Sequence, residues 1–241
     1  MISTFLILLF IVALLYASVG HGGASGYLAL MALYGFAPEV MKPTALILNL
    51  FVSLTSFLLF LKGGHFKWKL FLPFALASIP MSFLGGTIAL DAHIYKKILG
   101  ILLLFPVLRF FVYPNTADKD LKESNMIMSL VIGAVIGFLS GLIGIGGGIL
   151  LSPILLLLAW SNQKQTAAVS ALFIFVNSIA GLAGQLSHGI KIEPQMLSFV
   201  VVAFVGGLTG AWLGSLKFNQ QVLKYTLAVV LLMASVKLIL T

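Results

Sequence analysis

The chain has 241 residues and a formal net charge of +8, with 61% hydrophobic and only 8% charged residues. Soluble domains carry about 25% charged residues, so this composition excludes a globule that faces water on all sides and indicates a protein that faces lipid. The basic residues stand in short connectors and near the ends of apolar segments, without a basic stripe, so we expect no nucleic-acid partner. The absence of cysteine excludes disulfides and thiolate metal ligands.

The first apolar stretch, residues 2–36, is too long for one membrane-spanning helix. A bilayer core of about 30 Å needs roughly 20 residues, and this stretch would measure about 52 Å as one straight helix. The sequence Gly-His-Gly-Gly at residues 20–23 interrupts it, and several glycines together break a helix. We therefore predict two short helices folded back at the glycines, and a first helix that is retained rather than removed as a signal peptide.

Three complete apolar runs follow, and then a polar connector. Residues 44–61, 70–90 and 98–112 are each predicted to cross the membrane as helices, because backbone groups in lipid must be satisfied within the segment. The first of these is expected to begin at Thr44, a good N-cap, with Lys42 at the lipid headgroups. Residues 114–125 form the most polar stretch of the chain and are predicted to be a solvated linker.

The second part of the chain repeats this order. Residues 126–160 again form a stretch too long for one helix, interrupted by Gly-Ile-Gly-Gly-Gly at residues 144–148, and we predict a second broken helix pair. Residues 166–186, 196–213 and 222–240 are predicted to be spanning helices, the first of them beginning at Thr166.

These correspondences predict two related membrane halves, residues 1–113 and 126–241, joined by the linker 114–125. The paired glycines and the Lys-x-Thr-Ala sequences at residues 42–45 and 164–167 recur in the same order at offsets that differ by only a few residues. Each half changes sides an odd number of times, so the halves are expected to have inverted topologies, as in many secondary transporters. Placing the connector 62–69 in the cytoplasm divides the basic residues nine to five and leaves both termini periplasmic, in a multi-pass inner-membrane protein. The sequence leaves the oligomeric state open, a homodimer included.

The residues around the second glycine cluster carry a family resemblance. Residues 144–153, Gly-Ile-Gly-Gly-Gly-Ile-Leu-Leu-Ser-Pro, followed by Lys164-x-Thr166-Ala167, resemble the TauE/SafE family of sulfite and organosulfonate exporters, also called the toluene-sulfonate uptake permease family. The resemblance spans nearly the whole chain, although the first copy has Ala24 where the second has Gly148. It implies transport of sulfur-containing or related organic anions without a cofactor, and it does not fix the substrate.

The two glycine breaks are the first candidate binding residues. A helix that begins just after such a break exposes free N–H groups at the positive end of its dipole, and small residues let an anion approach them. We predict that the small residues of both breaks cradle the anion near the middle of the bilayer. These residues are Gly22, Gly23, Ala24, Ser25, Gly146, Gly147 and Gly148. The alternative is close helix packing through small residues, which is common in membranes.

Polar residues of the predicted helices are the second set. Thr44, Asn49, Thr166, Ser170 and Asn177 are predicted to line the substrate path, because polar groups in a membrane helix need a partner or a watery cavity. Simple capping by the threonines and contacts between helices by the asparagines are the alternatives.

His21, within the first glycine cluster, is a candidate for proton coupling, and a histidine turned towards water is its alternative.

The predicted function is secondary transport of a small anion rather than catalysis. The carboxylates lie in connectors, no pair of them falls within a predicted span, and neither general acid–base catalysis nor metal ligation has its residues. Residues 23–26 match the Gly-x-Ser-Gly of intramembrane serine proteases, but no histidine lies within a later predicted helix to activate the serine. The alternative to a carrier is an anion channel or a membrane scaffold without transport, and the duplicated helix breaks argue against a scaffold.

Overall fold

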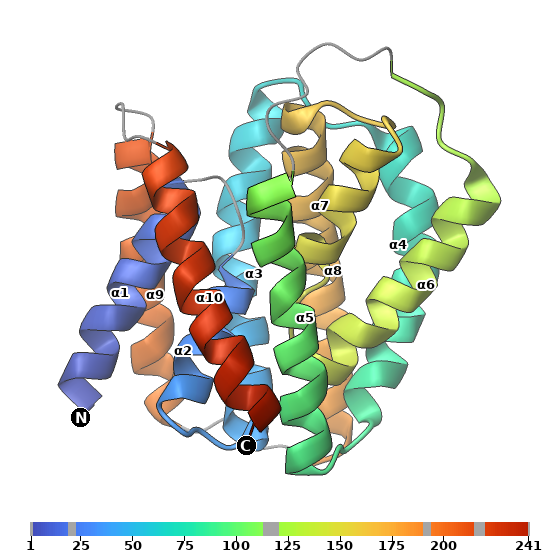
Figure 1. Ribbon diagram of the computed structural model, residues 1–241. Helices are drawn as coiled ribbons and strands as arrows, with labels where there is room; N and C mark the ends of the chain where they lie inside the picture. The colour runs from blue at the N-terminus through green and yellow to red at the C-terminus, as the bar shows by residue number, and fades with distance from the viewer. Residues whose placement is uncertain (1, 19–22, 113–120, 190–193, 215–219, 241) are drawn as a thin grey trace.

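The computed structural model describes residues 2–18, 23–112, 121–189, 194–214 and 220–240. These residues form ten α-helices and no strands, which confirms the prediction of an all-α membrane protein. Figure 1 shows the helices standing roughly side by side, with both chain termini at the lower end of the molecule.

Each part of the chain contributes five helices, one of them short. The short helices α2 and α7 have 10 residues each, and each follows a glycine cluster, so the predicted division of both long stretches into helix pairs is confirmed. The helices before the linker are α1 (Ile2–Ser18), α2 (Ala24–Leu33), α3 (Pro38–Lys62), α4 (Trp68–Thr87) and α5 (Ala92–Val112). Those after it are α6 (Met126–Ile143), α7 (Gly148–Leu157), α8 (Gln163–Ser187), α9 (Pro194–Gly214) and α10 (Gln220–Leu240).

The predicted helix starts at Thr44 and Thr166 are wrong. Helix α3 begins six residues earlier, with Pro38 at its first position, where a missing N–H costs nothing, and Pro43 lies in its second turn. Helix α8 begins at Gln163 because Asn162 accepts a hydrogen bond from the backbone of Gln165 and the Gln165 side chain returns one, a capping box.

The helices of the two parts pack in matching pairs. Helix α3 packs on α8 and α5 on α10, while α1 packs on α9 as α6 packs on α4. In Figure 1, α3 and α5 run from the lower to the upper end, whereas α8 and α10 run downwards. In the pairs α3–α8 and α5–α10, corresponding helices of the two parts therefore run in opposite directions and contact one another.

Glycines allow the helix pair α4–α6 to approach closely. Gly133, Gly137 and Gly141 recur every fourth residue along α6, and a Cβ atom at any of them would overlap backbone carbonyls of α4. Gly206 and Gly210 give α9 the same relation to α1. Such small-residue seams replace hydrophobic burial as the packing principle of membrane helices.

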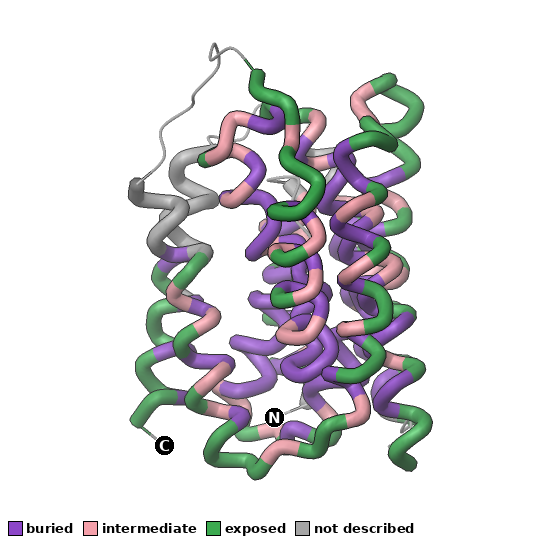
Figure 2. The backbone as a smooth tube through the Cα atoms, turned by 90° about the vertical axis from the view of Figure 1, so that its right-hand side faces the viewer, coloured by how far each residue is buried: buried purple, intermediate pink, exposed green. Residues whose placement is uncertain are grey.

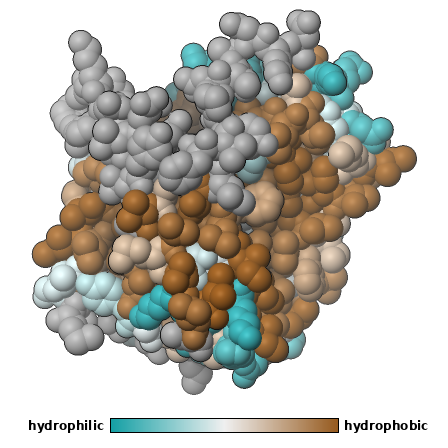
Figure 3. All heavy atoms as spheres, viewed as in Figure 1, coloured by the Kyte–Doolittle hydropathy of each residue, from teal (hydrophilic) through white to brown (hydrophobic). Residues whose placement is uncertain are grey.

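The outer surface of this bundle is apolar. Figure 2 shows that the inward faces of the helices are buried and that the outward faces are exposed. On the face drawn in Figure 3, hydrophobic residues form a broad band, and hydrophilic residues gather at the lower edge and the upper right. Within the described ranges, four helices are long and apolar enough to cross a membrane, namely α3, α4, α6 and α8.

Candidate functional site

The backbone between α6 and α7, residues 144–147, is the second break. Gly144, Gly146 and Gly147 have φ angles of 88°, 78° and 77°, which lie in the left-handed region that favours glycine. Gly147 is the N-cap of α7 and makes no side-chain cap. The N–H groups of Leu150 and Leu151 donate to the carbonyl oxygen of Gly147 at 3.1 Å. Those of Gly148 and Ile149 have no acceptor within the helix, and the positive end of the α7 dipole faces the break.

Polar side chains from α3 and α8 meet at this break. A Cβ atom on Gly146 would lie 2.6 Å from Asn49 Nδ2 and 3.1 Å from Ser178 Oγ. Asn49 Nδ2 donates a hydrogen bond to the carbonyl oxygen of Ile145 at 3.3 Å. Asn49 Oδ1 and Ser178 Oγ are both buried without a hydrogen-bond partner. Buried polar atoms ordinarily have partners, so these two groups are candidates for contact with a polar ligand or water.

Ser170 lies beside the first turn of α7. Its hydroxyl accepts a hydrogen bond of 2.8 Å from Ser152, which also donates to the carbonyl oxygen of Gly148 at 2.8 Å. A Cβ atom on Gly148 would lie 3.2 Å from the backbone oxygen of Ser170. The structure thus brings Ser170, Gly147 and Gly148 together with Asn49 and Gly146 around one end of α7.

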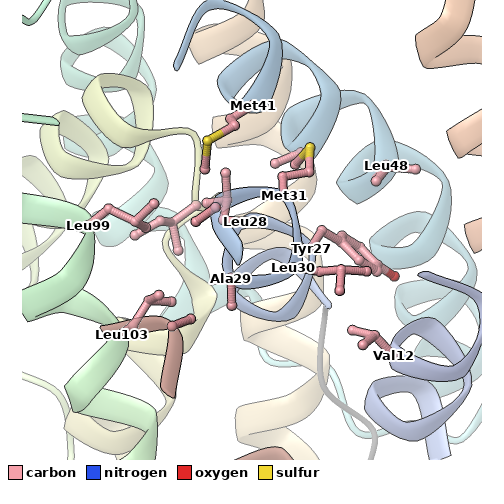
Figure 4. Packing of buried hydrophobic residues seen from close by; sticks show 14 of the residues in the cluster. Val12, Tyr27, Leu28, Ala29, Leu30, Met31, Met41, Leu48, Leu99 and Leu103 are labelled. Carbon is pink, nitrogen blue, oxygen red and sulfur yellow. The ribbon is translucent and has the colours of Figure 1, made fainter. Parts of the chain in front are cut away.

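The first break, residues 19–23, is described only at its last residue. Gly22 and His21 lie outside the described residues, and Gly23 is the N-cap of α2, again without a side-chain cap. Ser25 is buried and its hydroxyl lies 2.9 Å from the hydroxyl of Tyr16. Figure 4 shows α2 enclosed by side chains of α1, α3 and α5.

The described residues at the two breaks are not joined by hydrogen bonds. Within the described part of the chain, none connects Gly23, Ala24 or Ser25 with the residues of the second break. A buried apolar cluster links them instead, and it includes Tyr27 and Leu28 of α2 together with Ile145. The cradle predicted from both glycine clusters therefore stays a prediction.

The remaining predicted residues are buried, but they have other neighbours. Thr44 is fully buried and its hydroxyl has no partner, while the Thr166 hydroxyl lies 2.7 Å from that of Ser161. Asn177 Nδ2 donates to the carbonyl oxygen of Phe173 at 2.8 Å, and Ser82 of α4 donates to the backbone oxygen of Asn177 at 2.8 Å. The Asn177 backbone oxygen thus joins α8 to α4, while its Oδ1 is buried without a partner.

Lys42 was not among the predicted site residues, and the prediction that it lies at the lipid headgroups is wrong, because its side chain is buried inside the protein. Lys42 is 5% exposed, inside α3, with its Nζ 5.0 Å from the centre of the Tyr95 ring. Tyr95 donates a hydrogen bond of 3.1 Å to the carbonyl oxygen of Ile143, at the end of α6. Lys42 and Asn49 are seven residues apart, which is two helical turns and places them on one face of a helix. This spacing could have indicated from the sequence that Lys42 belongs to the same face as the predicted site residue Asn49.

Comparison with known proteins places this architecture in a family. The family model "Sulfite exporter TauE/SafE" matches residues 5–238. A Sinorhizobium fredii protein described as "Probable membrane transporter protein y4hK" is 37% identical over 240 residues, which cover 95% of each chain. "Probable membrane transporter protein MJ0441" of Methanocaldococcus jannaschii is 30% identical over 190 residues, 74% of this chain and 70% of that protein.

A plant relative carries the family name itself. "Sulfite exporter TauE/SafE family protein 1" of Arabidopsis thaliana is 33% identical over 88 residues, 36% of this chain and 19% of that protein. No solved structure matches the chain. The relatives are named as membrane transporters and the described helices include four of spanning length, so the chain is a multi-pass membrane protein. The chain belongs to the TauE/SafE sulfite exporter family.

Proposed function

We propose that the protein is a secondary carrier for small anions such as sulfite and sulfonates, and that it works by alternating access in the inner membrane. The observation that carries the proposal is the second break, where the start of α7, which has no side-chain cap, lies beside the unpartnered hydroxyl of Ser178. Free N–H groups at a helix start and a hydroxyl are donors that suit an oxyanion.

The position of this site between the two parts of the chain supports alternating access. Asn49 comes from the part before the linker, and Gly146 and Ser178 come from the part after it. We infer that the two parts are inverted repeats, since corresponding helices run in opposite directions in the pairs α3–α8 and α5–α10 and pack on one another. Rocking of one repeat against the other would open the site to either side of the membrane.

The names of the relatives support the choice of anion. The matched family is described by sulfite export, and the Arabidopsis relative carries the same description. A sulfite or sulfonate group presents several acceptor oxygens, which complement the donors of the second break.

The test is transport by the purified protein in liposomes. We expect saturable uptake of sulfite or a sulfonate, and accelerated uptake when the vesicles are preloaded with the same anion, because a carrier exchanges substrate across the membrane. Uptake that does not saturate and is not accelerated would identify a channel, and no flux of any tested anion would refute transport. Sulfite, thiosulfate, sulfonates and carboxylates form the panel, each at varied pH and sodium.

A pair of glycine variants connects the flux to the site. Gly147→Leu fills a position that is already crowded, where a Cβ atom would lie 2.8 Å from both Ile136 and Phe173, and uptake should be lost. Gly189→Leu imposes a similar backbone strain, at a φ angle of 82°, with nothing within 4 Å of the added Cβ. It should therefore retain uptake. Both variants should insert into membranes, and equal uptake by the two would remove the second break from the transport path.

A further inference from the structure

Lys42 is a buried cation that forms no ion pair with a carboxylate among the described residues. It is 5% exposed in the second turn of α3, and its contact is the face of the Tyr95 ring, 5.0 Å from Nζ. The nearest negative charge is that of Glu39, one turn earlier, which is exposed and acts on Lys42 across a distance without pairing with it. A buried ammonium is costly unless it is paired, and ionisable residues within membrane helices mark substrate paths.

Lys42 stands on the face of α3 that lines the second break. A Cβ atom on Gly144 would lie 3.0 Å from both Cα and the backbone oxygen of Lys42. Asn49, seven residues later and about 10 Å further along the same face, hydrogen-bonds to the carbonyl of Ile145. An anion that moves along this face from the lower end of the molecule therefore meets Lys42 before it reaches Asn49.

The Tyr95 ring lies beside the ammonium, and the end of α6 lies beside the Lys42 backbone. The Tyr95 hydroxyl is bonded to the carbonyl oxygen of Ile143, which fixes the ring beneath Nζ. The carboxyl end of α6, with its negative dipole end, also lies beside Lys42. A ring face and a helix dipole compensate a cation only in part, so an oxyanion that arrives here gains a strong, charge-assisted hydrogen bond.

This arrangement belongs to one part of the chain. Lys164, which the predicted repeat aligns with Lys42, is exposed in the first turn of α8. Lys42 and Lys164 therefore differ in burial, and only Lys42 lies beside the second break.

We propose that Lys42 binds the negatively charged group of the transported oxyanion, and that Tyr95 holds its ammonium when the site is empty. The inference rests on the proposed function and adds to it the residue that selects for charge. The ligand class is a small oxyanion with at least one full negative charge, such as sulfite or an alkyl sulfonate. Uncharged analogues such as sulfones would gain nothing from Lys42.

The test compares three variants in liposomes of phosphatidylcholine, a lipid without net charge. Lys42→Met keeps the length and removes the charge, and it should raise the KM for sulfite by about tenfold or more, as expected for the loss of one hydrogen bond to a charged group. Lys42→Arg keeps the charge and should stay much closer to the wild type. Lys164→Met, the matched control at an exposed lysine, should leave KM unchanged.

A measurement on the wild-type protein covers the case in which Lys42→Met fails to fold. Acetic anhydride labels a buried amine such as that of Lys42 only when the transport cycle opens the site to solvent, and mass spectrometry reports the extent of labelling at each lysine. Methanesulfonate should slow the labelling of Lys42 and leave that of Lys164 unchanged. Equal labelling of Lys42 with and without the sulfonate would overturn the proposal.

The outcomes separate this inference from the proposed function. Saturable uptake by the wild type with an unchanged KM for Lys42→Met would refute the role of Lys42 and leave the carrier intact. Absence of uptake by the wild type would refute the carrier and this inference with it. An effect of Lys42→Met that appears only with anionic lipid would assign the ammonium to a lipid headgroup, which also overturns the proposal.

Discussion

Gly146→Ala is the substitution whose effect follows most directly from the geometry of the second break. Gly146 has a φ angle of 78°, and an added Cβ atom would lie 2.6 Å from Asn49 Nδ2 and 2.9 Å from Ile174 Cγ2. The left-handed backbone costs an alanine about 1–2 kcal/mol, and overpacking of this kind adds about 1–3 kcal/mol. The free energy of unfolding should therefore fall by about 2–5 kcal/mol.

Gly64→Ala separates the two contributions. Gly64 has a φ angle of 71° and nothing within 4 Å of an added Cβ, so this variant should lose only about 1–2 kcal/mol. Unfolding in mixed detergent micelles measures both changes. Because the Asn49 amide must move away from the added methyl group, sulfite uptake should fall for Gly146→Ala and persist for Gly64→Ala. Equal losses of stability with equal uptake would refute the assigned contact between Gly146 and Asn49.

Three further predictions concern the scaffold, and each is checked by thermal unfolding in detergent. Gly210→Ala places a methyl group against a backbone carbonyl of α1 and should destabilise the protein by about 1–3 kcal/mol. Gly207→Ala has its nearest neighbour atom 3.6 Å away and should be neutral or stabilising. Similar effects of the two variants would contradict the close packing of α9 on α1. Asn162→Ala removes the capping box of α8 and should cost about 1 kcal/mol, and an unchanged midpoint would show that the box is dispensable. Lys237→Met removes the 2.7 Å hydrogen bond to the carbonyl oxygen of Leu33 at the end of α2, and a loss of about 1.5–3 kcal/mol is expected; no loss would mean that water replaces the ammonium.

The helix breaks were predictable because they depend on local chemistry. Several glycines within five residues oppose a helix whatever surrounds them, and the observed left-handed φ angles at residues 144, 146 and 147 are conformations that glycine adopts without strain. The same reasoning failed at the starts of α3 and α8. Pro43 is accommodated inside α3, and Asn162 caps α8 before Thr166 is reached, so hydropathy alone placed both starts too late.

The contacts of the site were beyond prediction because they depend on how distant helices cross. Asn49, Gly146 and Ser178 are far apart in the sequence, and only the packing of α3 on α8 beside the second break brings them together. Lys42 was placed at the headgroups because basic residues near segment ends ordinarily reach the lipid surface. Its burial follows from the longer α3 and from Tyr95, whose position is again a matter of tertiary packing.

The most direct test of the account is to locate a bound anion at the second break. Selenite has the shape and charge of sulfite, and its selenium atom gives an anomalous X-ray signal that fixes its position in crystals of the protein. The account predicts a selenium peak within hydrogen-bonding reach of the first N–H groups of α7 and close to Asn49 or Lys42. A peak elsewhere in a protein that transports selenite, with none at the second break, would contradict it.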